Sequence, residues 1–122
     1  MDNNVVLGYG AGFDMTSATL SVLIGQNAGA NLTSGANSIF IGATAGDGHD
    51  TEGNNLGIGS NALGGSIGGG EYNVAIGNNS LDALTSADRN TAIGYEALGG
   101  AIAGGALVKI ITIKFFFTAC SA

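Results

Sequence analysis

Three similar nonapeptides decide the fold of this chain: NLGIGSNAL at residues 55–63, NVAIGNNSL at residues 73–81 and NTAIGYEAL at residues 90–98. Each contains a glycine directly after an isoleucine, and looser copies of the pattern precede them. The glycines that follow an aliphatic residue are spaced by 17, 17, 17, 18 and 17 residues, and they are Gly8, Gly25, Gly42, Gly59, Gly77 and Gly94. Because self-similarity at a fixed period is the signature of repeat architectures, residues 1–107 are predicted to form one repeat domain.

The residues before each glycine predict a short strand. Aliphatic residues stand one and three positions before nearly every glycine, which is the period of a strand that ends at a turn. A unit of 17 residues is too short for a helix pair or a propeller blade, which need about 30 residues or more. The sequence therefore predicts an all-β fold, a parallel β-solenoid of about six 17-residue coils.

The three residues of each strand predict which side chains fill the coil. The column directly before the glycine is expected to form the coil core, and it consists of Leu7, Ile24, Ile41, Ile58, Ile76 and Ile93. Alternate residues of a strand point to opposite faces, so the middle column is expected to face away from that core. The middle column is apolar or small throughout, and it consists of Val6, Leu23, Phe40, Gly57, Ala75 and Ala92.

A strand that is apolar on both faces is buried on both faces. A thin coil fills only one of them, so the middle column predicts a second chain and favours a homotrimer around a long axis. The expected trimer interface is Val6, Leu23, Phe40, Ala75 and Ala92. Since bulk falls along this column, the chains are expected to approach more closely in the second half.

Polar residues recur four positions before each glycine. They are Asn4, Ser21, Ser38, Asn55, Asn73 and Asn90. In stacked coils this column is expected to form a ladder of side chains that bond along the stack.

The segments NVAIG and NTAIG, with the looser NLGIG and NVVLG, resemble the head repeats of trimeric autotransporter adhesins and the NTAIGYxAL-type repeats of bacteriophage tail fibres. The resemblance covers about residues 4–107. It implies a left-handed parallel β-roll, assembled as a trimer, that serves attachment at a surface. The adhesin head repeat is usually shorter, so the extra residues here are expected to enlarge a turn.

The net charge and the cysteine content limit the kinds of partner and cross-link that the chain can have. The formal net charge is −6, from nine acidic and three basic residues, which disfavours nucleic acid and anionic membrane surfaces as partners. Cys120 is the single cysteine and cannot form a disulfide within the chain. Residues 1–10 show no signal-peptide pattern, which tilts the interpretation towards a virion fibre over an exported adhesin.

One loop carries candidate metal ligands. Residues 45–53 read AGDGHDTEG and hold Asp47, His49 and Asp50, but the further ligands of a calcium loop are absent. The alternative is a solvated turn in which His49 packs inward, since it stands seven residues after its glycine like Met15, Leu32 and Leu84. The second interpretation is preferred, and no metal or cofactor is expected.

Catalytic motifs are absent from the sequence. The glycine-rich segments 64–71 and 99–106 lack the Gly-Lys-Ser/Thr ending of a phosphate loop and are interpreted as turns that place Ile67 and Ile102 inward. No nucleophile motif surrounds His49 or Cys120. A pair of acidic residues acting on a polysaccharide stays open as an alternative. Tyr9 and Tyr95 are candidates for contact with a glycan or protein receptor, or they stack beside turns.

The C-terminal segment, residues 108–122, breaks the repeat. It is interpreted as an apolar strand that docks onto an end-to-end neighbour, with Phe115, Phe116 and Phe117 as the docking residues. Residues 97–117 are long enough to span a bilayer, but Lys109 and Lys114 would be costly there. The sequence as a whole favours a non-enzymatic structural fibre or adhesin module on a virion or outside a cell. A self-assembling extracellular filament and a fibre-borne polysaccharide-degrading enzyme are the alternatives.

Overall fold

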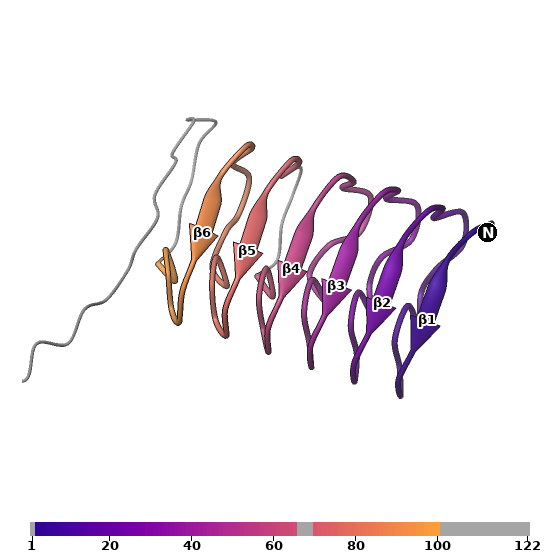
Figure 1. Ribbon diagram of the computed structural model, residues 1–122. Coiled ribbons are helices and arrows are strands. Elements are labelled where there is room, and N and C mark those ends of the chain that lie inside the picture. The colour runs from indigo at the N-terminus through magenta and orange to yellow at the C-terminus, as the bar shows by residue number, and fades with distance from the viewer. Residues whose placement is uncertain (1, 66–69, 101–122) are drawn as a thin grey trace, which may run out of the picture.

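A computed structural model describes residues 2–65 and 70–100 of the chain, and there it is a β-solenoid with one short strand per coil (Figure 1). The six strands form one sheet in chain order, with about five turns of chain between them. They are β1 (Val5–Leu7), β2 (Val22–Ile24), β3 (Ile39–Ile41), β4 (Leu56–Ile58), β5 (Val74–Ile76) and β6 (Thr91–Ile93). No helix occurs in this part of the chain, so the all-β prediction is confirmed.

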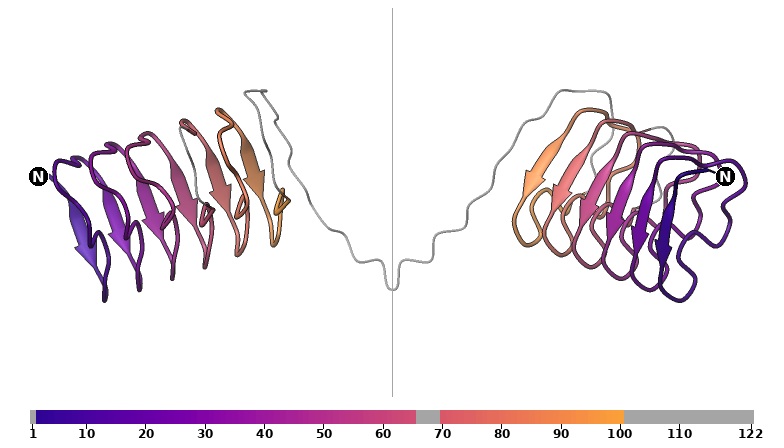
Figure 2. Two further views of the ribbon diagram at one scale, coloured as in Figure 1. Left: turned by 180° about the vertical axis from the view of Figure 1, so that it is seen from behind. Right: turned by 45° about the vertical axis from the view of Figure 1, so that its right-hand side comes forward.

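All strand pairs are parallel and in repeat register. The middle residue of each strand pairs with the middle residue of the next, as Val6 with Leu23 and Gly57 with Ala75. The second pair is in register although 18 residues separate its members rather than 17, so the extra residue lies outside the strands. Figure 2 shows the chain returning behind the sheet after β1, β2, β3 and β5, so each of these coils encloses a narrow interior.

The glycine after each strand is required by the stacking. At Gly25 and Gly77, φ is +132° and +129°, a region that residues with a side chain rarely adopt. A Cβ atom at either position would lie 2.4 Å from the carbonyl oxygen of the equivalent glycine in the next coil, Gly42 or Gly94. The glycine column therefore lets neighbouring coils approach to the spacing of a β-sheet, about 4.8 Å.

Left-handed backbone conformations turn the other corners. In every coil the residue before the polar ladder and the second residue after the glycine have positive φ, as at Asn37 (+58°) and Asn61 (+57°). Asparagine tolerates this conformation better than most residues, which explains why it is frequent at these positions.

The structure reverses the predicted faces of the strand. The middle column lies inside the coil, where Leu23, Phe40, Gly57, Ala75 and Ala92 are buried, so these residues do not form an interface between chains. The column predicted to be the core lies outside, with Leu7 65% and Ile93 41% exposed. The members of that column between these two are half-buried, and they are Ile24, Ile41, Ile58 and Ile76.

A second column completes the core, and its bulk is complementary to that of the strand. Val6, Leu23 and Phe40 share their coils with a glycine four residues after the repeat glycine, namely Gly12, Gly29 and Gly46. Gly57, Ala75 and Ala92 share their coils with a leucine at that position, namely Leu63, Leu81 and Leu98. The falling bulk of the middle column is therefore compensated within each coil, not by a closer approach of chains.

The polar ladder is present as predicted. The backbone N–H of Asn73 donates to Asn55 Oδ1, and the N–H of Asn90 donates to Asn73 Oδ1, each at 2.9 Å. Ser21 and Ser38 continue the ladder through longer bonds of 3.3 Å to the N–H of the next residue in the column. Because these groups are buried, the ladder satisfies polar atoms that would otherwise oppose folding.

Several predicted features lie outside the described residues. They are the inward placement of Ile67 and Ile102, the C-terminal segment 108–122 with Phe115, Phe116 and Phe117, and the environment of Cys120.

Candidate functional site

The outer face of the sheet is an apolar surface that runs across all six described strands. Two columns form it, the first and third residues of every strand, and eleven of the twelve residues are aliphatic. The twelfth is Thr91, and none is charged. Four of these residues are exposed, among them Val5 (53%) and Ile39 (38%), and the other eight are half-buried, so this face is partly open to solvent along its length. A contiguous apolar face of this kind marks an interaction surface.

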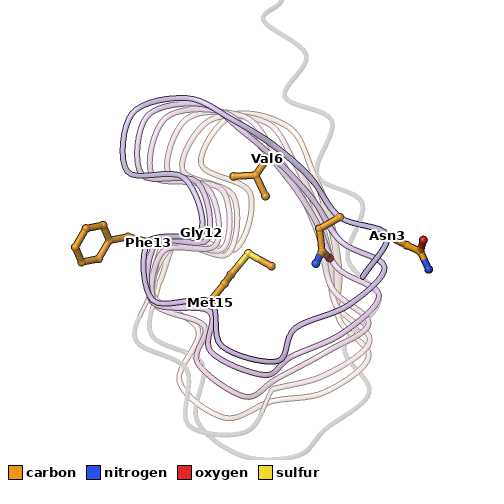
Figure 3. Close-up of a pocket in the computed structure, with 6 residues that line it drawn as sticks. Asn3, Val6, Gly12, Phe13 and Met15 are labelled. Carbon is orange, nitrogen blue, oxygen red and sulfur yellow. The ribbon is translucent and has the colours of Figure 1, made fainter. Parts of the chain in front are cut away.

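The solenoid has an open end at its first coil (Figure 3). Val6 and Met15 point into the coil interior, where a concavity of about 400 Å³ is lined by Asn3, Asn4, Val6, Gly12, Phe13 and Met15. Val6 is 45% exposed, whereas Leu23 and Phe40 in the same column are fully buried. The interior of the first coil is therefore exposed along the axis.

Two aromatic side chains stand out from the first corner. Tyr9 is 85% exposed and Phe13 is 81% exposed, and Figure 3 shows Phe13 pointing away from the coil. They line a concavity of about 410 Å³ together with Asn27 and Asn31 of the next coil. The sequence drew attention to Tyr9 but not to Phe13, which is the aromatic member of a column otherwise occupied by small or acidic residues in the described coils.

His49 packs inward, as its column predicted. It is fully buried, and its ring lies 4.9 Å from that of Phe40 at an interplanar angle of 48°. Neither ring nitrogen has a hydrogen-bond partner. Burial lowers the pKa of His49 to about 4, although the negative charge of Glu52 acts in the opposite direction. The imidazole is therefore neutral at pH 7 and serves as a core side chain.

The acidic residues near His49 do not form a metal site with it. Burial raises the pKa of Asp47, against the effect of its hydrogen bonds with backbone N–H groups. Asp50 accepts a hydrogen bond from the Thr33 hydroxyl, and Glu52 accepts the N–H groups of Asp50 and Thr51 at 2.9 and 3.1 Å. Among the described residues, no group of three or more His, Cys, Asp or Glu side chains is placed to hold a metal ion.

A small acidic concavity lies at the corner of the last two described coils. It has a volume of about 280 Å³ and is lined by Asn79, Asp82, Glu96, Gly99 and Gly100. Asp82 Oδ1 is buried without a hydrogen-bond partner. Tyr95 is close by in sequence, and hydrogen bonding with the Glu96 carboxylate raises the pKa of its hydroxyl. Asp82 and Glu96 are the two acidic residues that line this concavity.

Comparison with protein-family models, curated proteins and solved structures found no match. The resemblance to adhesin and tail-fibre repeats therefore rests on the repeat residues alone and stays a prediction. In the part of the chain that the structure describes, no helix is long and apolar enough to cross a membrane.

Proposed function

We propose that this chain is a non-enzymatic structural module of a surface fibre that mediates attachment, and that it works as a homotrimer. The observation that carries the proposal is the uncharged outer face of the six-stranded sheet. A single coil cannot cover this face, and covering eleven aliphatic side chains with other copies of the sheet would stabilise an assembly through the hydrophobic effect.

The proposed interface differs from the one that the sequence indicated. The first and third residues of each strand meet the partner chains, and the middle residues fill the coil. Three sheets facing a common axis form a closed cyclic assembly, in which no face is left to recruit further chains sideways. The left-handed coil and the virion or extracellular location follow from the resemblance and belong to the same proposal.

Native mass spectrometry tests this assembly. The proposal expects three copies per particle, and a monomer would contradict it. Ile41→Glu places a charge in the middle of the outer face and is expected to yield folded monomers. Gln26→Glu, a change at an exposed residue beside the sheet, is the matched control and leaves the trimer intact.

The alternative of a polysaccharide-degrading enzyme is supported by one observation, the concavity that Asp82 and Glu96 share. It predicts that the purified chain lowers the viscosity of a polysaccharide and that Asp82→Asn abolishes the loss. Unchanged viscosity across a panel of such polymers is the result that the structural proposal expects.

A further inference from the structure

We infer that the corner between the first two coils binds one ring of a neutral saccharide. The site is the concavity of about 410 Å³ that Tyr9 and Phe13 line together with Asn27 and Asn31. The two aromatic rings supply its stacking surface, and the two side-chain amides supply its hydrogen bonds. The inference rests on the proposed attachment role, for which it names the class of ligand, but it does not rest on the trimer.

The two aromatic side chains point outward because of their positions in the coil. Phe13 is 81% exposed and points away from the coil (Figure 3). Tyr9 directly follows the repeat glycine, and its equivalents in the later coils are all exposed: Gln26, Ala43, Ser60, Asn78 and Tyr95. None of these five is followed by an aromatic residue four positions later. Among the described coils, the first is therefore the one that presents two exposed aromatic side chains at this corner.

The amides of the second coil are available to a ligand. Neither Asn27 nor Asn31 makes a side-chain hydrogen bond with another described residue, whereas the Asn61 amide, equivalent to that of Asn27, donates to Asn79 Oδ1 at 3.3 Å. Gly10 leaves the space that the Asn27 amide occupies, because a Cβ atom at residue 10 would overlap with Asn27 Oδ1. Each amide offers two N–H donors and a carbonyl acceptor, which suit a pair of neighbouring sugar hydroxyls.

Backbone hydrogen bonds between the two coils hold the walls of the site in place. The Asn27 N–H donates to the Tyr9 carbonyl at 2.8 Å, and the Asp14 N–H donates to the Ala30 carbonyl at 2.9 Å. A ligand therefore meets a site that is already formed, which lowers the entropic cost of binding. Because these backbone groups are engaged, they are not available to an added peptide strand, whose binding depends on such groups.

The chemistry of the lining favours a sugar without charge. The face of an aromatic ring is electron-rich, so it attracts the C–H groups of a pyranose ring, which neighbouring oxygens polarise. All residues that line the concavity are uncharged, and they are Tyr9, Gly10, Phe13, Asn27, Ala30 and Asn31. A carboxylated sugar or a nucleotide would find no cation there, and the net charge of −6 would repel it.

Saturation-transfer difference NMR of the full chain tests the inference with three probes: methyl β-D-glucopyranoside, methyl β-D-galactopyranoside and methyl N-acetyl-β-D-glucosaminide. At least one is expected to bind with a dissociation constant on the order of 1 mM, as expected for a ligand of this size. The strongest transfer is expected at the ring C–H protons. Methyl β-D-glucuronide is expected to bind roughly tenfold more weakly than the glucoside, because its carboxylate has no partner.

Three results with these probes would overturn the inference. The first is no transfer to any of the three neutral glycosides, and the second is a preference for the glucuronide. The third is saturable binding of an uncharged peptide, acetyl-Leu-Leu-amide, in place of the glycosides.

Point variants locate the binding site. Phe13→Ala removes one ring at an exposed position, so the fold is expected to stay intact while binding weakens by roughly tenfold. Asn31→Leu keeps a side chain of similar size without donors or an acceptor and is expected to weaken binding by roughly fivefold. Tyr95→Ala is the matched control, since Tyr95 shares the column of Tyr9 but has Gly99 in place of an aromatic partner. Unchanged affinity of Phe13→Ala, or a loss of affinity in Tyr95→Ala, would overturn the inference.

Ile41→Glu separates this inference from the proposed trimer. None of the lining residues belongs to the two outer columns of the sheet, so the monomeric variant is expected to bind the glycosides with unchanged affinity per chain. A parent with three copies per particle that binds none of the glycosides would overturn this inference and leave the assembly standing. A monomeric parent that binds them at Phe13 would support this inference and contradict the assembly.

Discussion

The coils that begin at β1, β2 and β3 (the first half) and those that begin at β4, β5 and β6 (the second half) share the same strand and turn conformations in their described residues but fill their interiors differently. In the third coil the strand supplies the bulk through Phe40, and Gly46 leaves room for its ring. In the fifth coil Ala75 leaves the room, and Leu81 supplies the bulk from the corner. Each coil thus receives about the same core volume, from opposite walls. The bulk that fills a coil can therefore come from either of two positions, the middle of the strand or the fourth residue after the repeat glycine.

The two ways of filling a coil differ in backbone strain at the corner residue. Leu63, Leu81 and Leu98 adopt left-handed φ values of +54°, +50° and +51°. A leucine in this conformation loses roughly 1 kcal/mol or more relative to a glycine. The second half therefore accepts backbone strain in order to bury a leucine, and the first half avoids the strain by using glycine at the corner.

The largest effect on stability is expected when a coil with a bulky middle strand residue and a corner glycine is converted to one with a small strand residue and a corner leucine. Phe40→Ala leaves a cavity and is expected to cost about 3–5 kcal/mol. Gly46→Leu alone overpacks the coil, because its Cβ atom would lie 2.4 Å from Phe40 Cδ1. The double variant recreates the second type of core and is expected to be more stable than the sum of the single changes predicts, by about 2 kcal/mol.

Urea unfolding followed by circular dichroism measures the three variants. If the losses in the free energy of unfolding of the two single variants simply add in the double variant, the side chains at positions 40 and 46 do not share one space. The two halves would then not be alternative ways of filling the same core.

The repeat glycines should matter equally in both halves, because the backbone plan is shared. Gly25→Ala and Gly77→Ala each place a Cβ atom 2.4 Å from a carbonyl oxygen at a φ unsuited to alanine. Each is expected to cost about 3 kcal/mol or more in thermal unfolding. Gly100→Ala is the control with no neighbour to meet, and it should leave the melting temperature unchanged. Unequal losses of thermal stability for Gly25→Ala and Gly77→Ala would show that the backbone geometry differs between the two halves.

His49 is the one polar side chain in a core column whose other described members are Met15, Leu32 and Leu84. Its pKa is lowered from 6.5 to about 4 in the folded chain. Between these values the unfolded chain binds more protons, so stability is fully present above pH 6.5 and is lost as the pH falls towards 4. The loss is expected to reach about 3 kcal/mol at the lower limit. The raised pKa of Asp47 acts in the opposite sense and offsets part of it.

His49→Leu tests whether the third coil is otherwise an ordinary member of the first half. The variant should be about 1–2 kcal/mol more stable at pH 7, because two unpartnered ring nitrogens are removed. Its stability should also fall less steeply than that of the parent below pH 6.5. Asp47→Asn, made in both backgrounds, isolates the contribution of the neighbouring carboxyl. A parent whose stability is flat between pH 6.5 and 4 would contradict the burial of an unpaired imidazole.

The ladder should show the smallest difference between the halves. Asn73 accepts the Asn90 N–H at 2.9 Å and its Nδ2 donates to the Ala87 carbonyl at 3.1 Å. Ser38 accepts the Asn55 N–H at 3.3 Å. Asn73→Ala is expected to cost about 2 kcal/mol and Ser38→Ala about 1 kcal/mol. Hydrogen exchange of the Asn90 and Asn55 amides measures the two sites separately. Equal losses of protection at the two amides would contradict the expectation that Asn73 contributes more than Ser38.

The sequence predicted the coil, the strand positions, the register and the ladder, because the period of the repeat determines all four. It did not predict which face of the strand points inward. In a three-residue strand such as Ile39–Ile41 all positions are apolar, so alternation divides them into two sets without telling which set is inside. The fall in bulk from Phe40 to Gly57 was attributed to partner chains and proved to be compensated within the coil.

A signal for the correct face was present in the chain. Wherever the middle strand residue is large, the residue four after the repeat glycine is glycine, and wherever it is small, that residue is leucine. Such reciprocal bulk indicates two side chains that share one space. The exposure of Phe13 and the hydrogen bonds of Glu52 could not be predicted in this way, because each occurs once and no repeat supports it.

The extra residue between β4 and β5 leaves the register of both strands intact, since Leu56 still pairs with Val74 and Asn55 still bonds Asn73. The length of the segment between these two strands is thus uncoupled from the register of the sheet. A peptide inserted between β4 and β5 would therefore be carried at a height along the axis that the register of these two strands determines. The number of coils before an inserted segment therefore determines its position along the axis of the solenoid.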